Sequence, residues 1–463
     1  MQFTRSKTAT TGLISAAALV LCACSGDSSA RSDAPALTAP IGNVLVIVGD
    51  DIGTDMIGAY HLHPNAPPTP VIDSLAASGV LFERAYACPT CSPTRGEIMT
   101  GRYDFRFGVG SPIKEWLAEA ALPFSEVTLF EMLDHAGSTP IPDSVVGKWH
   151  LGSVSVGGAS DPNLQGVQWF EGTLGNVWHT QNYFSHDKVI NGVTIPSSTY
   201  ATTEQVDDAL ARIQAMPQPW FLYLAFNAAH EPYHAPPAYL HTYTLSGVPS
   251  ATPNPHFCAA VQAMDTEIGR LLSSMPAATR ENTTIIFIGD NGTPNEAVIP
   301  PSISGRSKGS LFEGGVHVPL IVSGKAVRSP GTTCSAFVEA VDLFPTIADL
   351  FGRNYRVGVG DNRKIDGLSL LKYIRDPNAA PQRSFVYSER FAPNGFGPYA
   401  TQGWMVRDDH WKLIRIAGMP DAFFDMQGAL FEGPDLLRNP PLTAEQQNAY
   451  DHLAQVMDAV IHS

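Results

Sequence analysis

Three short runs of apolar, β-branched and aromatic residues most constrain the fold of this chain. They occupy residues 43–48, 220–226 and 284–288. Runs of this kind are typical of strands that are buried on both faces of a parallel sheet. Apolar residues recur at helical spacing over 258–272, and residues 71–79 predict another helix. Strands that alternate with helices predict an α/β fold, an α/β/α sandwich around a large, mostly parallel sheet.

The pattern changes in the last quarter of the chain. Residues 358–364 are interpreted as a connection, residues 404–416 as a strand-like segment and residues 445–461 as a helix. We therefore expect a main domain over 41–355 and a smaller α+β subdomain, built on an antiparallel sheet, over 356–463.

The first 24 residues are predicted to be a targeting segment. A basic start precedes an apolar run over 13–21 that is too short to span a bilayer as a mature helix. The sequence Leu21-Cys22-Ala23-Cys24 resembles a bacterial lipoprotein box, with Cys24 as the lipidated residue, and a plain secretory peptide is the alternative. Residues 25–40, rich in Ser, Ala, Asp and Pro, predict a flexible tether. We expect an exported protein of the bacterial periplasm or outer membrane, anchored through Cys24.

The charge of the chain excludes one class of partner. With 29 basic and 44 acidic residues, the formal net charge is -15. Such a balance argues against nucleic acid or an anionic membrane surface as a general partner. An acidic protein that binds an anion must gather its positive charge locally, so clustered Lys, Arg and His residues are informative.

Two acidic pairs directly follow predicted strands. Asp50 and Asp51 follow the first strand, and Asp290 and Asn291 follow the third. Because the carboxyl ends of parallel strands meet at one edge of a sheet, these side chains are expected to converge. Either pair alone is better explained as turn chemistry. Together they predict a site for a hard cation, calcium or magnesium rather than zinc.

The segment around Cys91 predicts a nucleophile at the start of a helix. Pro93 follows it by two residues and Arg95 by four, and proline is well placed in a first helical turn. A side chain at a helix N-terminus meets unpaired N–H groups that favour anions. Cys88 and Cys91 also form a Cys-x-x-Cys, but a thioredoxin-like redox pair leaves Pro93 and Arg95 unexplained.

Three further segments carry polar side chains suited to an anion. Lys148 and His150 would lie on the same side of an extended segment, although an exposed edge would also place them in solvent. His230 follows a strand end, where a lone histidine is more often structural. Lys308 opens a glycine-rich stretch over 308–319. An oxidising compartment would also allow a disulfide between the remaining cysteines, Cys258 and Cys334.

The order and spacing of these motifs resemble the type I, formylglycine-dependent sulfatases of the alkaline phosphatase-like superfamily. The Cys-x-Pro-x-Arg motif matches at every position, and the resemblance extends over about residues 42–350. It implies an arylsulfatase-like enzyme that cleaves aryl or carbohydrate sulfate esters. In that family a formylglycine-generating enzyme oxidises the cysteine to an aldehyde, whose hydrate attacks sulfur.

The resemblance also implies roles for individual residues. The implied catalytic residues are Cys91, Arg95, Lys148, His150, His230 and Lys308. The implied ligands of calcium, with magnesium less favoured, are Asp50, Asp51, Cys91, Asp290 and Asn291. Two features depart from the family pattern: residues 137–143 lack the customary tyrosine, and His317 stands where an arginine is common, so His317 is left unassigned.

Two other functions fit the same motifs. A phosphonate monoester or phosphodiester hydrolase shares the fold and handles an anion of similar shape, and a lipoprotein with an unmodified thiol could bind sulfated glycans without cleaving them. Residues that could contact a substrate, or equally pack under loops, are Glu231, Tyr233, His234, the stretch 173–188 with Trp178, His179, Tyr183 and His186, and Trp404 and Arg407.

Overall fold

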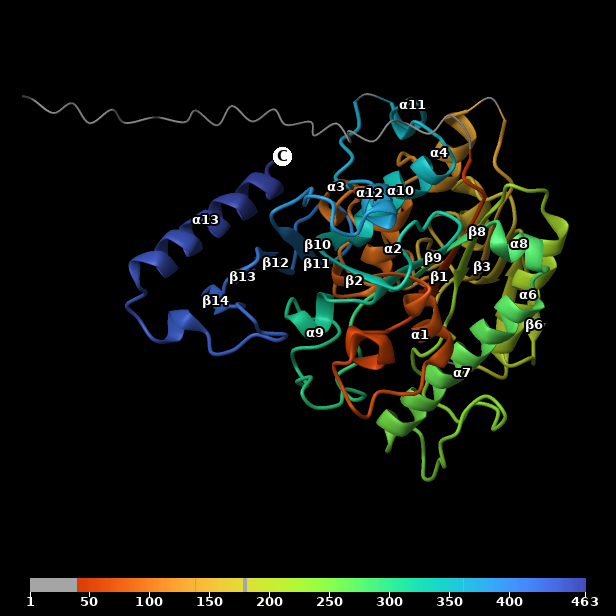
Figure 1. Cartoon of the computed structure of the whole chain (residues 1–463), viewed down its shortest axis with the longest axis horizontal. Coiled ribbons are helices and arrows are strands. Elements are labelled where there is room, and N and C mark those ends of the chain that lie inside the picture. The colour runs from red at the N-terminus through yellow and green to blue at the C-terminus, as the bar shows by residue number, and fades with distance from the viewer. Residues whose placement is uncertain (1–39, 138, 178–180, 361) are drawn as a thin grey trace, which may run out of the picture. The chain divides into compact units, whose positions relative to one another are not determined.

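The computed structural model describes residues 40–137, 139–177, 181–360 and 362–463 (Figure 1). The predicted targeting segment, Cys24 and the tether up to residue 39 lie outside this part. The described chain from residue 40 onwards belongs to one compact unit. Within it, a ten-stranded sheet and a four-stranded sheet are the two β structures.

The large sheet is mixed and mostly parallel. Its strand order is β10-β2-β9-β8-β1-β7-β3-β4-β5-β6. In chain order these strands are β1 (Asn43–Gly49), β2 (Gly79–Tyr86), β3 (Asp143–Lys148), β4 (Phe170–Thr173), β5 (His186–Ile190), β6 (Val193–Ser197), β7 (Phe221–Ala225), β8 (Thr283–Gly289), β9 (Leu320–Gly324) and β10 (Thr332–Glu339). The three apolar runs form β1, β7 and β8, with β1 parallel to both neighbours at the centre of the sheet. The predicted strands and the α/β fold class are confirmed.

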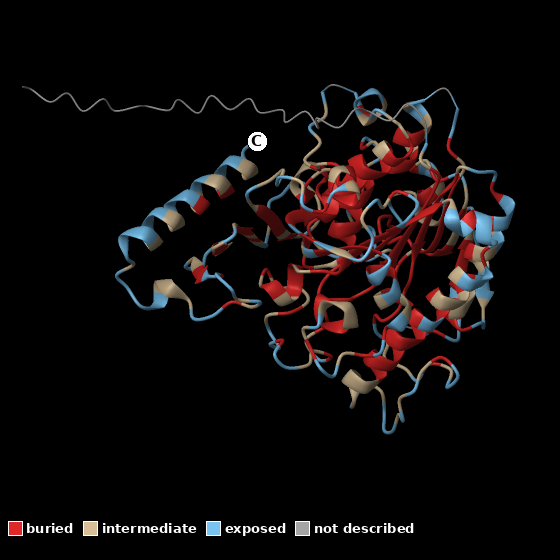
Figure 2. Cartoon of the chain, viewed as in Figure 1, coloured by how far each residue is buried: buried red, intermediate tan, exposed pale blue. Residues whose placement is uncertain are grey.

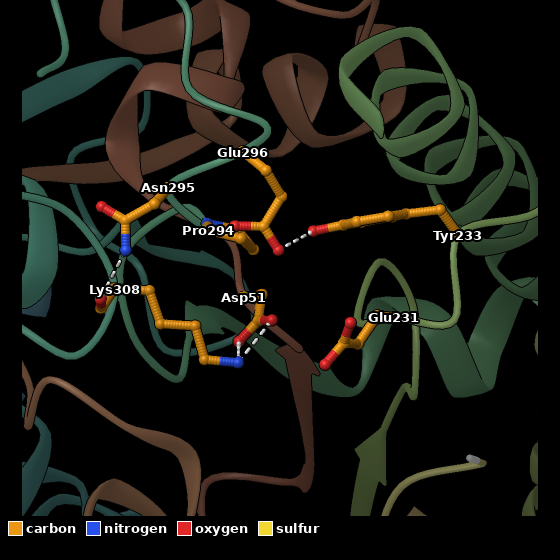
Figure 3. A pocket seen from close by; sticks show the side chains of 7 residues that line it. All are labelled: Asp51, Glu231, Tyr233, Pro294, Asn295, Glu296 and Lys308. Atoms are coloured by element: carbon orange, nitrogen blue, oxygen red, sulfur yellow. Dashed lines mark hydrogen bonds and ion pairs between the residues drawn. The ribbon is translucent and has the colours of Figure 1, made fainter. Parts of the chain in front are cut away.

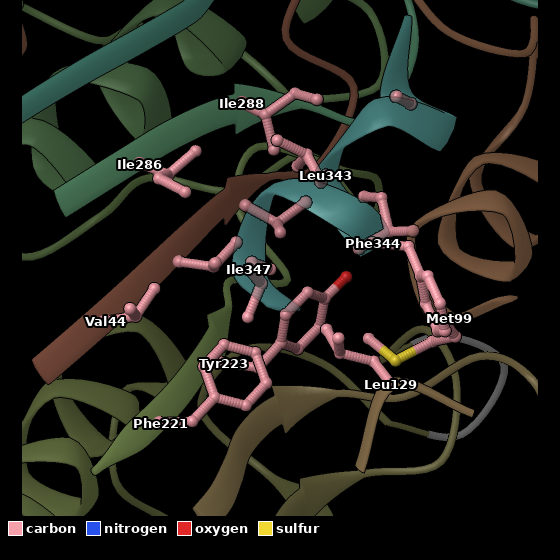
Figure 4. Packing of buried hydrophobic residues seen from close by; sticks show 14 of the residues in the cluster. Val44, Met99, Leu129, Phe221, Tyr223, Ile286, Ile288, Leu343, Phe344 and Ile347 are labelled. Atoms are coloured by element: carbon pink, nitrogen blue, oxygen red, sulfur yellow. The ribbon is translucent and has the colours of Figure 1, made fainter. Parts of the chain in front are cut away.

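Helices cover both faces of this sheet because successive strand residues point to opposite sides. One face, with Val44, Ile286 and Ile288, packs against α2 (Cys91–Thr100), α4 (Leu129–His135), α10 (Leu343–Leu350) and α12 (Leu371–Arg375) (Figure 4). The other packs against α1 (Pro70–Ala77), α6 (Ala201–Ala215) and α7 (Pro253–Ser274). Figure 2 shows the buried residues concentrated along the strands. The helices predicted over 71–79 and 258–272 correspond to α1 and α7.

The shorter helices lie in the connections between these elements. They are α3 (Asp104–Phe107), α5 (Asp161–Leu164), α8 (Ala277–Glu281), α9 (Glu313–Val316) and α11 (Tyr355–Val359). Helix α11 runs into the segment 358–364, so the prediction of a plain connection there was wrong for its first residues.

The small sheet is antiparallel, with the order β11-β12-β13-β14. Its strands are β11 (Val386–Ala392), β12 (Thr401–Arg407), β13 (Trp411–Ile416) and β14 (Ala422–Asp425). The prediction of one strand-like segment over 404–416 was wrong, since Asp408 accepts hydrogen bonds from the backbone N–H groups of His410 and Trp411 and turns the chain into a hairpin. The predicted C-terminal helix is α13 (Ala444–Ile461), which buries Leu453 and Met457 against this sheet.

Candidate active site

The two acidic pairs meet at one edge of the large sheet. Gly49 at the end of β1 is in register with Gly289 at the end of β8, so the residues that follow emerge side by side. The backbone N–H of Asp51 donates to Oδ1 of Asp290 at 3.0 Å, and Nδ2 of Asn291 donates to Oδ1 of Asp51 at 2.8 Å. Asp51 has a left-handed backbone with φ 65°, a conformation that aspartate tolerates better than most residues.

Cys91 is the first residue of α2 and faces these carboxylates. Its Sγ lies 3.4 Å from Oδ1 of Asp50 and 3.8 Å from Oδ1 of Asp51. Burial, reinforced by the charge of Asp290, raises the pKa of the thiol well above its ordinary value. A thiolate is therefore strongly disfavoured here, and an unmodified Cys91 would be a poor nucleophile.

Three cations neutralise the buried carboxylates. Nη2 of Arg95 lies 2.8 Å from Oδ2 of Asp290, and Nη1 donates to the carbonyl oxygen of Lys148 at 2.9 Å. Nζ of Lys148 lies 2.5 Å from Oδ2 of Asp50, and Nζ of Lys308 lies 2.6 Å from Oδ2 of Asp51. Burial alone would raise the pKa values of Asp50 and Asp51. The charges of Lys148 and His230 nevertheless hold the pKa of Asp50 below its ordinary value. The charges of Lys308 and His230 do the same for Asp51.

His150 reaches the site by a turn rather than along a strand. Strand β3 ends at Lys148, and His150 has φ 62°, so the extended segment predicted for these residues was wrong at His150. Its Nε2 donates to the carbonyl oxygen of Ile113 at 2.9 Å, while Nδ1 is buried without a hydrogen-bond partner in the described chain. Burial and the charges of Lys148 and Arg95 lower the pKa of His150 well below its ordinary value. The imidazole is neutral, with a lone pair on Nδ1.

His230 follows β7 and completes the ring of side chains. Its Nδ1 donates to the carbonyl oxygen of Glu231 at 2.7 Å, and its Nε2 lies 3.8 Å from Oδ2 of Asp51. Tyr183 donates its hydroxyl to the carbonyl oxygens of Asn227 and His230, which fixes this loop from behind. Burial and the charge of Lys308 lower the pKa of His230.

The donor atoms at this edge fit a hard divalent cation. One ligand atom each from Asp50, Asp51, Cys91 and His230 lies within 4.8 Å of the others. Beside them, Oδ1 of Asn291 is buried without a hydrogen-bond partner among the described residues. A buried amide oxygen that no donor satisfies is expected next to a cation. With the carboxylate oxygens it forms the kind of donor set that calcium prefers.

A cavity of 440 Å³ opens above these groups, and Cys91, His150, His230 and Lys308 all line it. Asn176, within the stretch 173–188 that the sequence suggested for substrate contact, lines the same cavity with its Oδ1 buried and unpartnered in the described chain. Sequence reasoning missed residues 111–114 and Ala392. No motif marked these positions, because their place in the site depends on how distant loops meet.

The suggested substrate contacts divide into two groups. Glu231 and Tyr233 line a second cavity of 210 Å³, together with Asp51, Glu296 and Lys308 (Figure 3). The others that the structure describes are held by internal contacts: His234 stacks on Tyr183 at 4.0 Å, His186 contacts Glu204 at 2.9 Å, Arg407 pairs with Glu313, and Trp404 packs under α13. Trp178 and His179 lie outside the described residues.

The remaining cysteines and His317 have structural surroundings. Cys88 is a free thiol that donates to Oδ2 of Asp104 at 3.0 Å, so no redox pair with Cys91 is formed. Cys258 and Cys334 are also free and belong to packing clusters on opposite faces of the sheet, which contradicts the suggested disulfide. His317 stacks on Tyr86 at 5.3 Å and contacts the carbonyl oxygen of Glu83 at 2.7 Å.

Comparison with known proteins agrees with this geometry. Arylsulfatase J from Mus musculus is 26% identical over 80% of this chain and 64% of its own length, and the uncharacterized sulfatase YdeN from Escherichia coli is 28% identical over 74% and 60%. The chain thus spans less than two thirds of both relatives. The crystal structure of Ps i-CgsB with neocarrahexaose has a TM-score of 0.70, at 24% identity over 86% of this chain and 89% of that one. A family model described as Sulfatase matches residues 42–353, and the chain therefore belongs to the sulfatase family.

Proposed function

We propose that this protein hydrolyses sulfate monoesters, aryl or carbohydrate, to an alcohol and sulfate. The observation that carries the proposal is that Cys91 and Lys308 line the 440 Å³ cavity, while the buried cations Arg95 and Lys148 pair with the carboxylates next to Cys91. Buried cations of this kind stabilise the negative charge that develops on a sulfuryl group. Membership of the sulfatase family supports the same reaction.

Two groups complete the proposed site. Cys91 becomes formylglycine through a formylglycine-generating enzyme, and Asp50, Asp51, Asp290, Asn291 and residue 91 hold a calcium ion. When bound, these groups supply an oxygen nucleophile in place of sulfur and a hard cation beside the sulfate. The buried, unpartnered Oδ1 of Asn291 and the raised pKa of the Cys91 thiol support this choice.

The chain's own residues then bind the substrate and move protons. Lys308, which lines the cavity, donates to the sulfate oxygens, and the positive charges of Arg95 and Lys148 offset the negative charge that these oxygens carry. His150 accepts a proton at Nδ1, the nitrogen left unpartnered when Nε2 binds the Ile113 carbonyl. Lys308 at Nζ, or His230 at Nε2 when its imidazole carries both protons, donates a proton to the leaving oxygen. A general acid–base step of this kind contributes roughly 10²–10⁴-fold.

Mass spectrometry of the peptide that carries Cys91 tests the proposal most directly. The protein, co-produced with a formylglycine-generating enzyme, should show the aldehyde mass, bind calcium and turn over 4-nitrophenyl sulfate repeatedly. Cys91→Ser lacks the aldehyde and should lose repeated turnover. Native turnover in that variant would contradict the proposal.

The same preparation separates the alternatives. Faster cleavage of an aryl phosphodiester than of the aryl sulfate would instead identify a phosphonate monoester or phosphodiester hydrolase. A free thiol at Cys91 in the native protein, with binding but no turnover of sulfated glycans, would identify a glycan-binding protein.

We also propose export to the periplasm or outer membrane with a lipid anchor at Cys24, on the lipoprotein box in the sequence. Within the described ranges no helix has the length and apolar character needed to cross a bilayer. Labelled palmitate should be incorporated by the native chain and lost in Cys24→Ser. Incorporation that persists in the variant would rule out this anchor.

A further inference from the structure

Two smaller cavities flank the catalytic cavity, and their charges are opposite. The 210 Å³ cavity in Figure 3 contains Glu231 and Glu296 in addition to the ion pair of Asp51 and Lys308. The cavity on the other flank has a volume of 230 Å³. Among the described residues that line it, none is acidic and Arg390 is the one cation.

Arg390 lies on β11 of the small sheet and is half-buried. Its Nη1 donates to the carbonyl oxygen of Gly309, the residue after Lys308, at 2.5 Å. Within the described part of the chain, no carboxylate pairs with this guanidinium.

A second polar group at this cavity also lacks a partner. The hydroxyl of Thr90, the residue before Cys91, is buried with no hydrogen bond to any described residue. Pro112 and Phe391 form apolar wall beside it. A guanidinium and a hydroxyl next to apolar surface match an anionic group carried on a sugar ring, whose C–H face packs on apolar side chains.

This cavity adjoins the catalytic one. Ser111, Pro112 and Ala392 line both. A substrate whose scissile sulfate lies near Cys91 can therefore extend towards Arg390 along these shared residues. Extension of an anion into the 210 Å³ cavity would instead bring it against Glu296 and against Glu231, which lines both that cavity and the catalytic one, and like charges repel.

We infer that the 230 Å³ cavity is a second anion-binding subsite, and that the substrate is a carbohydrate with another sulfate or a carboxylate besides the sulfate that is cleaved. This inference rests on the proposed sulfatase function and specifies its substrate class. The Glu231 and Glu296 side accepts a neutral part of the substrate.

Matched saccharide pairs test the subsite by binding, without turnover. In a Cys91→Ser background, calorimetry at 0.15 M salt compares D-glucosamine 2-N,6-O-disulfate with N-acetyl-D-glucosamine 6-sulfate, and disulfated with monosulfated chondroitin disaccharides. At least one disulfated member should bind more tightly than its partner. Arg390→Gln should reduce that preference about tenfold or more, the usual size of a hydrogen-bonded charge contact.

Two control variants separate charge recognition from a structural role, because Arg390 also holds the Gly309 carbonyl. Arg390→Lys keeps the charge and should retain part of the preference. Arg415→Gln removes an arginine of β13 that pairs with Asp421 at 3.0 Å, and should leave the preference unchanged.

Several results overturn the subsite: no preference for any disulfated saccharide, an equal loss for both members of a pair in Arg390→Gln, or no loss at all. The proposed function fails by different observations, namely a free thiol at Cys91 and no cleavage of 4-nitrophenyl sulfate. The two failures are therefore distinguishable.

Discussion

At the scale of single residues, backbone carbonyls decide how the two site histidines act. A carbonyl oxygen only accepts hydrogen bonds, so the histidine nitrogen that faces it must carry the proton. In His150 that nitrogen is Nε2, bound to Ile113, and in His230 it is Nδ1, bound to Glu231. The other nitrogen of each ring is then the one available to exchange protons in the proposed reaction. The two rings therefore present opposite nitrogens, Nδ1 in His150 and Nε2 in His230.

The first prediction concerns His150. His150→Ala should lower kcat for 4-nitrophenyl sulfate by roughly 10²–10⁴-fold, because it removes the Nδ1 proton acceptor. His186→Ala is a matched control, since His186 is also buried but contacts Glu204 on α6. It should lower Tm and leave kcat of the folded enzyme nearly unchanged. Equal kcat losses in both variants would contradict the role of His150.

At the scale of elements, a buried ion cluster joins the Lys308 segment to the small sheet. Nζ of Lys412 on β13 lies 2.8 Å from Oε1 of Glu313 on α9 and 2.6 Å from Oε1 of Glu432. Arg407 on β12 pairs with Glu313 as well, and Tyr86 of β2 donates its hydroxyl to the same carboxylate. Both sheets thus share one set of charges, none of which reaches solvent freely.

Removing the central cation should destabilise the protein strongly. Lys412→Met leaves Glu313 and Glu432 buried beside an apolar side chain, and breaking a buried pair in this way costs about 3–5 kcal/mol. Urea denaturation measures the change in the free energy of unfolding. Lys325→Met, at an exposed lysine, should change it by about 0.5 kcal/mol or less. A similarly small effect of Lys412→Met would show that the cluster is not held as described.

The same cluster predicts how stability depends on pH. Burial alone would raise the pKa of Glu313, but Lys412 and Arg407 lower it from 4.5 to about 2. A carboxylate whose pKa is lower in the folded state stabilises the fold above pH 4.5, and this contribution is lost as the pH falls towards 2. The stability difference between wild type and Glu313→Gln should therefore be constant from pH 7 to 5 and shrink below 4.5. A difference that stays constant down to pH 3 would count against this assignment.

At the scale of the whole molecule, the shared charges and packing predict one cooperative transition. Phe337 of β10 and Val386 of β11 belong to the same buried cluster, so neither sheet has a core of its own at this contact. Tryptophan fluorescence and far-ultraviolet circular dichroism should report the same midpoint on heating or in urea. Two separate midpoints would mean that the small sheet unfolds independently.

The sequence predicts the central strands of the large sheet well, and turns and local backbone conformation poorly. Residues 43–48 and 284–288 can be recognised as central strands because almost every residue in them is apolar, as burial on both faces of the sheet requires. The ends of these strands then locate Asp50 and Asp290. The turn at Asp408 was missed because apolar residues on both sides of it continue the strand pattern. The left-handed backbone of His150 was missed because no glycine or asparagine marks it.

The arrangement of charged residues around the catalytic cavity could not be predicted from local sequence patterns. Arg390, Thr90 and Pro112 come from three separate segments, and Glu231 and Glu296 from two more. Of these residues, the sequence pointed to Glu231 alone as a possible substrate contact, without indicating which charges would face it. The cation of one small cavity and the carboxylates of the other come near the catalytic cavity only when the two sheets pack together. That packing depends on contacts such as the hydrogen bond from Arg390 to the carbonyl oxygen of Gly309.

The burial of α2 means that any enzyme that modifies Cys91 has to act before the chain has folded. Every residue of α2 is buried, and Cys91 is 1% exposed. A modifying enzyme therefore cannot bind this segment in the folded protein. Part of its cover is α10, which the ribosome makes roughly 250 residues after Cys91. At about 5–20 residues per second, that interval lasts about 12–50 s. Under the proposed function, aldehyde formation at Cys91 therefore competes with folding, and substitutions that slow the docking of α10 should increase the fraction of protein that carries the aldehyde.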